Sequence, residues 1–369
     1  MRIPCSNLSL CVAALWSAST AGLAACSEGE SATAPKTDAE YESAIVTGMH
    51  DSLLTDIDDL CKASQALADA APEPSGRGWD ADEDADALEA MKVAWIDART
   101  AYEHIEGALA PLFPDIDFSI DARYDDFLTK LGGKGDDNPF DGKGVTGLHA
   151  AERILWADAI PARVVEFETA LPGYRAASFP PSEQAAADFK HGLSAKIVDD
   201  AMLLRAQWKP QKIDLAGAFV GLISLMNEQQ EKVNKAASNE EESRYSQRTM
   251  ADIRDNLAGT IPIYALFAPW LATKTDAGDA SKDGERTDRS IRQGFDGLSK
   301  LYATVKSDAI PEPPATWSAE DPSEADLQTD FGKLYHSVKA AVDPTEPGSI
   351  VDEMNKAAEI LGFPELQEE

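Results

Sequence analysis

The chain has 369 residues, of which 43% are hydrophobic, enough to build a sizeable core. Its 65 Asp and Glu residues outnumber its 33 Lys and Arg residues, and the formal net charge at pH 7 is −32. A surface this acidic repels phosphate groups, which excludes nucleic acid as a partner, and attracts cations instead.

The first 25 residues predict a secretory signal peptide. Their apolar run is too short for a membrane-spanning helix and ends in the sequence LAAC at positions 23–26. Small residues before a cysteine are typical of bacterial lipoproteins, so we expect Cys26 to become the lipidated first residue of a protein held at the periplasmic face of a membrane or at the cell surface. An ordinary signal peptidase site is the alternative. Ser27, directly after the lipidated residue, favours the outer membrane.

Residues 26–39 are small and polar and predict a flexible tether, and residues 40–365 predict a helical domain. The clearest helix lies within 82–109, where apolar residues recur every three or four positions, as on one buried helix face. These residues are Met91, Trp95, Ala98, Tyr102, Ile105 and Leu109. Similar periodicity recurs at about 40–70, 146–169, 184–208, 213–237, 245–270, 287–306, 324–342 and 349–361. No segment alternates as a strand would, so the predicted fold class is all-α.

Segments rich in proline, glycine or small polar residues separate the predicted helices. Breaks are expected at 71–79, 110–119, 131–145, 171–183, 271–286 and 308–322. The break at 171–183 divides the chain near its middle, so we expect two packed helical bundles, at about 40–170 and about 184–365, with about eight to ten helices in total. Once Cys26 is lipidated and the signal peptide removed, Cys61 has no partner for an internal disulfide, and its apolar neighbours predict a buried side chain.

The helix within 82–109 carries a first group of candidate site residues beside its apolar face. On a helical wheel Glu106 lies close to Tyr102, with Arg99 and Glu103 further round on the same side. An exposed ion pair between Arg99 and Glu103, four residues apart, is the simplest interpretation. The position of Glu106 argues against a wholly exposed arrangement, because an unpaired acid beside the buried face is costly.

His149 and Glu152 form a second group. They are three residues apart on a predicted helix, so their side chains share a face and can converge on one ion. Glu152 also falls in an apolar stripe with Leu148 and Leu155, where a carboxylate must be neutralised, paired or metal-bound. Taken alone, the HxxE pattern also fits a satisfied His–Glu pair in the core.

Three blocks of sequence, in this order, resemble the imelysin-like family, and in particular its EfeM/EfeO-type lipoproteins of bacterial iron uptake. They are residues 95–106 with Ile120-Asp121-Ala122-Arg123, the GxHxxE motif at 147–152, and the stretch from Leu225-Met226-Asn227-Glu228 through Arg244-Tyr245-Ser246 to Gly259. The resemblance covers about residues 40–342. Gln247, where relatives often have histidine, and Ala101, where proline is common, depart from the family pattern.

The resemblance implies an all-helical pair of bundles with a metal site between them, in a protein that captures iron for a membrane transporter. The metal ligands that it implies are Glu103, Glu106, Asp121, His149, Glu152 and Glu228. A site rich in carboxylate oxygens with a single imidazole suits iron, and copper or zinc can compete for it.

Two other functions stay open at this point. The name of the family refers to proteolysis, so a metallopeptidase that uses the HxxE motif is the main alternative. Such an enzyme normally needs three protein ligands, a water and a general base around zinc, and here one site would supply them with a single histidine. A structural lipoprotein that has lost its metal is the third interpretation, which Gln247 leaves open.

Overall fold

The computed structural model describes residues 36–275 and 283–366. Within these ranges the regular structure is helical, and the β-type pairing is confined to a bridge between Thr275 and Asp283. The predicted all-α fold class is therefore confirmed. Cys26, the predicted signal peptide and most of the predicted tether lie outside the described residues. Among the helices of the described ranges, none combines the length and apolar character needed to cross a membrane.

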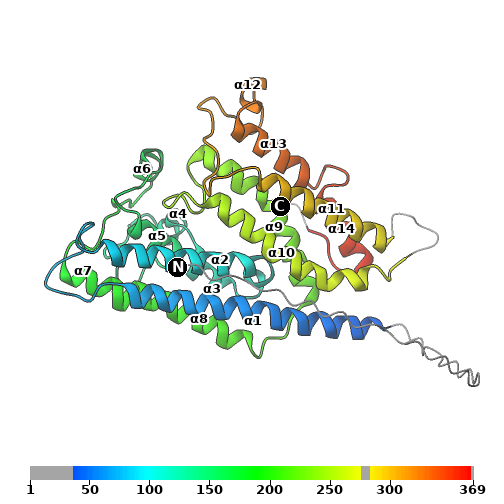
Figure 1. The fold of residues 1–369 in the computed structure, drawn as a ribbon, viewed down its shortest axis with the longest axis horizontal. Helices are drawn as coiled ribbons and strands as arrows, with labels where there is room; N and C mark the ends of the chain where they lie inside the picture. Colours follow the sequence, from blue (N-terminus) through cyan, green and yellow to red (C-terminus); the bar gives the residue numbers. More distant parts are fainter. Residues whose placement is uncertain (1–35, 276–282, 367–369) are drawn as a thin grey trace, which may run out of the picture. The chain divides into compact units, whose positions relative to one another are not determined.

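The first two helices are the longest in the first half of the chain. Helix α1 (Asp38–Ala70) and helix α2 (Ala85–Leu109) lie against each other, and α8 (Ser194–Trp208) packs on α1 (Figure 1). Helix α1 begins where the predicted tether ends, because Thr37 and Glu40 form a capping box that satisfies free backbone N–H groups.

The buried residues of α1 and α2 agree with the sequence analysis. Every member of the predicted apolar stripe from Met91 to Leu109 is buried. Cys61 is buried as well, and its thiol lies 3.3 Å from the carbonyl oxygen of Ala201 on α8. Cysteine here acts as a small apolar side chain with a weak donor, as predicted.

Short helices connect α2 to the second half of the chain. They are the 3₁₀ turn η1 (Ala110–Leu112), α3 (Pro114–Asp121), α4 (Tyr124–Lys130), α5 (Gly147–Leu155) and α6 (Ala162–Thr169). The expectation of a break at 110–119 is wrong, because η1 and α3 together cover all of that segment except Phe113. Pro114 is accepted in the first turn of α3, where its missing N–H costs no hydrogen bond, and the acids that follow it suit the positive end of the helix dipole.

Gly147 holds the start of α5 against the end of α3. Its φ is +84°, and a Cβ at this position would lie 2.3 Å from the carbonyl oxygen of Ile120. Only glycine tolerates both the positive φ and so close a backbone. The first turn of the GxHxxE motif therefore sits beside Asp121, the last residue of α3.

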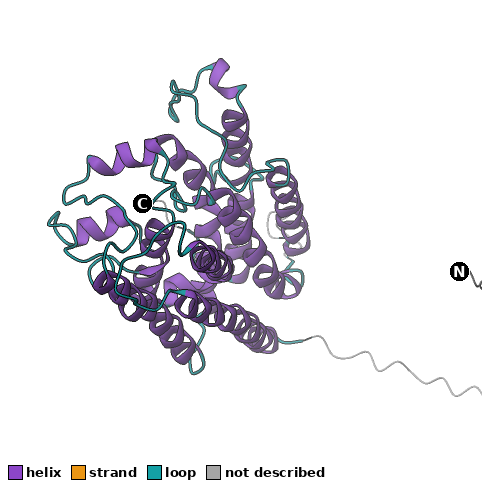
Figure 2. Cartoon of the chain, turned by 60° about the vertical axis from the view of Figure 1, so that its left-hand side comes forward, coloured by secondary structure: helices purple, strands orange, loops and turns teal. Residues whose placement is uncertain are grey.

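Figure 2 shows helices joined by loops throughout the described chain. The helices that follow α6 differ widely in length. They are α7 (Glu183–Asp188), a π-helical turn (Phe189–Leu193) that continues into α8, α9 (Leu215–Ser238), α10 (Thr249–Leu271), α11 (Gly284–Tyr302), α12 (Glu324–Leu327), α13 (Asp330–Val342) and α14 (Ile350–Leu361). Helices α9 and α10 also pack on α2, so helices from both halves of the chain meet there. The bundle boundary at 171–183 stays a prediction.

Candidate metal centre

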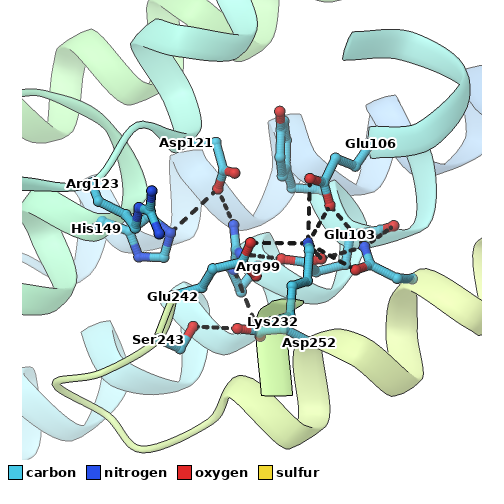
Figure 3. Close-up of polar contacts among 12 residues, drawn as sticks. Arg99, Glu103, Glu106, Asp121, Arg123, His149, Lys232, Glu242, Ser243 and Asp252 are labelled. Carbon is cyan, nitrogen blue, oxygen red and sulfur yellow. Dashed lines mark hydrogen bonds and ion pairs between the residues drawn. The ribbon is translucent and has the colours of Figure 1, made fainter. Parts of the chain in front are cut away.

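Charged side chains from several helices meet around the C-terminal half of α2 (Figure 3). We call the carboxylates among them the acid cluster: Glu103 and Glu106 from α2, Asp121 from α3, Glu242 from the loop between α9 and α10, and Asp252 from α10. One carboxylate oxygen each of Glu103, Glu242 and Asp252 lies within 4.8 Å of the other two. Oxygens this close to one another can share a cation.

Arg99 lies inside the acid cluster and is only 1% exposed. Its guanidinium forms ion pairs with Glu103 and Asp121. It also lies 3.4 Å from Oε2 of Glu242, and its Nε is 3.6 Å from Oδ1 of Asp252. The Arg99–Glu103 pair expected from the spacing is therefore present, but it is buried rather than exposed.

Lys232 on α9 is the second cation of the cluster. Its Nζ lies 3.0 Å from Oε1 of Glu242 and 3.2 Å from Oε2 of Glu106. Asn256 on α10 accepts a hydrogen bond from this ammonium at 3.0 Å and donates one to Oε2 of Glu106 at 2.8 Å. Gly259, one turn further along α10, allows this approach to α2, since a Cβ there would lie 2.2 Å from a backbone carbonyl of α2.

The acid cluster holds more carboxylates than Arg99 and Lys232 can balance, and its titration reflects this. Burial raises the pKa of Asp121 to about 7, although the charge of Arg99 acts in the opposite direction. Burial likewise raises the pKa of Asp252 to about 7. Burial also acts to raise the pKa of Glu242, but Lys232 and Arg99 outweigh it and hold that pKa at about 2. The site therefore favours a further positive charge.

His149 presents a buried lone pair to this site. Its Nδ1 lies 2.9 Å from Oε2 of Glu152, an acceptor, so Nδ1 carries the proton and Nε2 does not. Burial, reinforced by the charge of Arg99, lowers the pKa of His149 and keeps the ring neutral at pH 7. Within the described residues Nε2 is buried without a hydrogen-bond partner, and it lies 3.5 Å from Oδ1 of Asp121. A metal ligated by both atoms would satisfy this lone pair, and an imidazole backed by a carboxylate is typical of metal-binding histidines.

Glu152 lies behind His149 rather than beside the acid cluster. While its Oε2 accepts from the imidazole, its Oε1 accepts hydrogen bonds from the backbone N–H of Tyr245 at 3.1 Å and from the N–H and hydroxyl of Ser246 at 2.7 Å each. Both oxygens are thus engaged within the protein. The geometry makes Glu152 the residue that orients His149.

The structure brings most of the sequence-predicted ligands together. Glu103, Glu106, Asp121 and His149 surround one region, whereas Glu152 reaches it only through His149. Glu228 lies one turn before Lys232 on α9, is exposed, and in the described part of the chain makes no hydrogen bond or ion pair with the acid cluster.

Several residues of the site were missed in the sequence analysis: Lys232, Glu242, Asp252 and Asn256. Glu242 comes two positions before the Arg-Tyr-Ser block, which was a usable signal, but nothing in the sequence separates it from Glu240 and Glu241 beside it. Asn256 lies within the third block of the family resemblance, but no role was predicted for it from the sequence.

A cavity of about 320 Å³ lies on one side of the acid cluster. Asp121 and Glu242 line it with Asp117, Arg123 and Lys235 among others, and the side chains of Asp121 and Glu242 are 16% and 12% exposed. Hydrated ions can therefore reach these two carboxylates from solvent. His149 does not line this cavity, but its Nε2 lies 3.5 Å from Asp121, which does.

A family model described as imelysin matches residues 46–309. The chain is 28% identical over 242 residues to the "Iron uptake system component EfeO" of Shigella boydii serotype 4 (strain Sb227), covering 63% of this chain and 53% of that protein. It is 28% identical over 222 residues to the protein of the same name from Escherichia coli (strain K12), covering 58% and 48%. The chain thus spans about half the length of the curated relatives it matches.

A solved structure resembles the fold. The crystal structure of an imelysin-like protein from Psychrobacter arcticum 273-4 aligns with a TM-score of 0.56, covering 90% of this chain and 98% of that chain, at 13% sequence identity. At this identity the likeness concerns the fold alone. Helices with this arrangement are thus found in a second protein of very different sequence.

Proposed function

Because the chain belongs to the imelysin family, we propose that it is a lipid-anchored extracytoplasmic protein that captures iron for uptake. The names of the EfeO relatives support iron as the bound ion. The LAAC sequence that ends at Cys26 supports a lipid anchor, and Ser27 favours the outer membrane. The captured ion would pass to an iron transporter. Copper and zinc are the competing ions, since nitrogen and oxygen ligands alone favour copper.

The observation that carries this proposal is the buried Nε2 of His149, which has no hydrogen-bond partner among the described residues and faces a carboxylate. We assign His149, Asp121 and Glu242 as the ligands nearest the cavity, with Glu103 and Glu106 deeper in the acid cluster. These side chains offer one neutral nitrogen and several carboxylate oxygens, a donor set that suits iron. Glu152 supports the imidazole, and Glu228 stays a predicted ligand.

The metallopeptidase alternative draws no support from this geometry. In an HxxE enzyme the glutamate would be the natural general base, and a base must reach a metal-bound water. Glu152 instead accepts hydrogen bonds from His149, Tyr245 and Ser246 through both of its oxygens. We therefore propose capture of the ion rather than hydrolysis.

Equilibrium dialysis with metal analysis tests the proposal. The purified protein, freed of metal with a chelator, is dialysed against Fe(II) without oxygen, and separately against Cu(II) and Zn(II). We expect one tightly bound ion per chain, with affinity lowered about tenfold or more in a variant that combines His149→Ala and Glu106→Gln. Glu89→Gln, an exposed acid on the same helix α2, is the matched control and should bind as the unmodified protein does. Absence of stoichiometric binding, or equal binding by the double variant, would disprove the proposal.

A further inference from the structure

Lys232 pairs with carboxylates that a captured cation would need as ligands. Its side chain is 3% exposed, and its ammonium contacts Glu106 at 3.2 Å and Glu242 at 3.0 Å. Glu103 lies within 4.0 Å on the same side. An ammonium so enclosed balances part of the negative charge of the carboxylates around it.

We propose that Lys232 is a built-in competitor of the captured ion: its ammonium neutralises Glu106 and Glu242 while the site is empty, and it leaves them when a metal binds. This inference rests on the proposed function. A metal ion and an ammonium cannot both approach the same carboxylate oxygens closely, because like charges repel and each needs direct contact.

Lys232 is better suited to leave than Arg99, the other cation of the site. Arg99 faces four carboxylates with a planar guanidinium, while the ammonium of Lys232 is a point charge on a flexible four-carbon stem. Glu228, one turn before Lys232 on α9, is exposed and attracts this ammonium electrostatically. A displaced Lys232 thus has an acid near solvent to move towards.

A competitor of this kind makes capture reversible. The acids are never left unpaired in the empty protein, which would cost stability, and the returning ammonium assists release of the ion. A protein that transfers its ion to a transporter must be stable without the ion and must be able to release it. Without Lys232 the same acids would bind a metal more tightly and release it more slowly.

The test compares metal dissociation constants, measured by equilibrium dialysis against Fe(II) and Zn(II), in the full mature chain. We expect Lys232→Met to bind metal roughly tenfold tighter or more, because a unit charge within a few ångströms of the ion is removed from a buried site. Lys232→Arg should bind about tenfold weaker, because a guanidinium holds carboxylates with two parallel hydrogen bonds. Lys300→Met is the matched control: it removes the same charge from an exposed side chain of α11 that is paired with Asp296, and it should leave the affinity unchanged.

Thermal unfolding separates this role from a purely structural one. Without metal, Lys232→Met should have a lower melting temperature than the unmodified protein. With saturating metal, its melting temperature should equal or exceed that of the unmodified protein. Loss of a purely structural contact would lower the melting temperature under both conditions. If the unmodified protein binds metal and Lys232→Met binds equally or more weakly, the inference fails while the proposed function stands. If Lys232→Met does not fold, Lys232→Arg decides: unchanged or tighter binding overturns the inference. If neither the unmodified protein nor any variant binds metal, the proposed function itself fails.

Discussion

At the scale of single residues, the two side chains of the HxxE motif have different roles: the histidine offers a ligand atom and the glutamate orients the histidine. The spacing of His149 and Glu152 predicted a shared face, and they do share one, but they use it to bond each other. The hydrogen bond to Nδ1 fixes the tautomer that leaves Nε2 free. The acid that stabilises the ring is therefore as important to the site as the ring itself, although it need not touch an ion.

Glu152→Gln should weaken metal binding by about 10- to 100-fold, the usual effect of losing the carboxylate behind a metal-binding histidine. The amide oxygen would turn to the N–H donors of Tyr245 and Ser246, which leaves the amide NH₂ facing Nδ1 of His149. The proton of the ring would then move to Nε2 and block the lone pair. Nitrogen-15 NMR of the ring reports this change of tautomer directly, and dialysis reports the affinity.

Glu166→Gln, an exposed acid on α6, serves as the control for that substitution. It should leave both the tautomer and the affinity unchanged. A Glu152→Gln protein that keeps the proton on Nδ1 and binds metal normally would show that Glu152 does not orient His149.

At the scale of helices, the repeating apolar pattern predicted most of the elements, because burial of one face is what makes a helix stable in a protein. The face of α2 from Met91 to Leu109 is an example. Helix α3 was missed because eight residues that begin with proline and carry three acids show too little periodicity. That short helix nevertheless carries Asp121, so the apolar pattern failed to predict an element that contributes to the candidate site.

Gly147→Ala should destabilise the protein and loosen the site at the contact between α3 and α5. The positive φ of +84° costs an alanine about 1–2 kcal/mol. Its Cβ would also lie 2.3 Å from the carbonyl of Ile120, so the two helices must separate and carry His149 away from Asp121. We expect the free energy of unfolding to fall by about 2 kcal/mol or more in urea titrations, with weaker metal binding.

Gly297→Ala in α11 is the control, because nothing lies within 4 Å of a Cβ at that position and its φ is helical. Alanine there should raise the free energy of unfolding by up to about 1 kcal/mol and leave metal binding unchanged. Equal stability of Gly147→Ala and the unmodified protein would contradict the close packing of α3 and α5.

At the scale of the whole molecule, the sequence predicted the type of site better than it predicted which residues form the site. A net charge of −32 pointed to cations, and the blocks around Glu103, His149 and Arg244 pointed to the imelysin family, which the comparison confirmed. Which of 65 acids meet depends on contacts between residues far apart in the chain, such as Arg99 with Glu242. No local pattern encodes such a contact, so Glu242, Asp252 and Lys232 appeared only in the folded structure.

The whole-molecule charge also sharpens the prediction of a lipid anchor. Anionic headgroups repel a chain of net charge −32, so retention on a membrane should depend on the acyl chains that we propose at Cys26. Stable anchoring needs more than one such chain. In a bacterium that processes lipoproteins, Cys26→Ala should move the protein from the membrane fraction to the soluble extracytoplasmic fraction. Its intact mass should lack the lipid. Cys61→Ala, which changes the buried cysteine of α1, should stay with the membranes. Retention of the Cys26→Ala protein on membranes after a high-salt wash would refute the anchor.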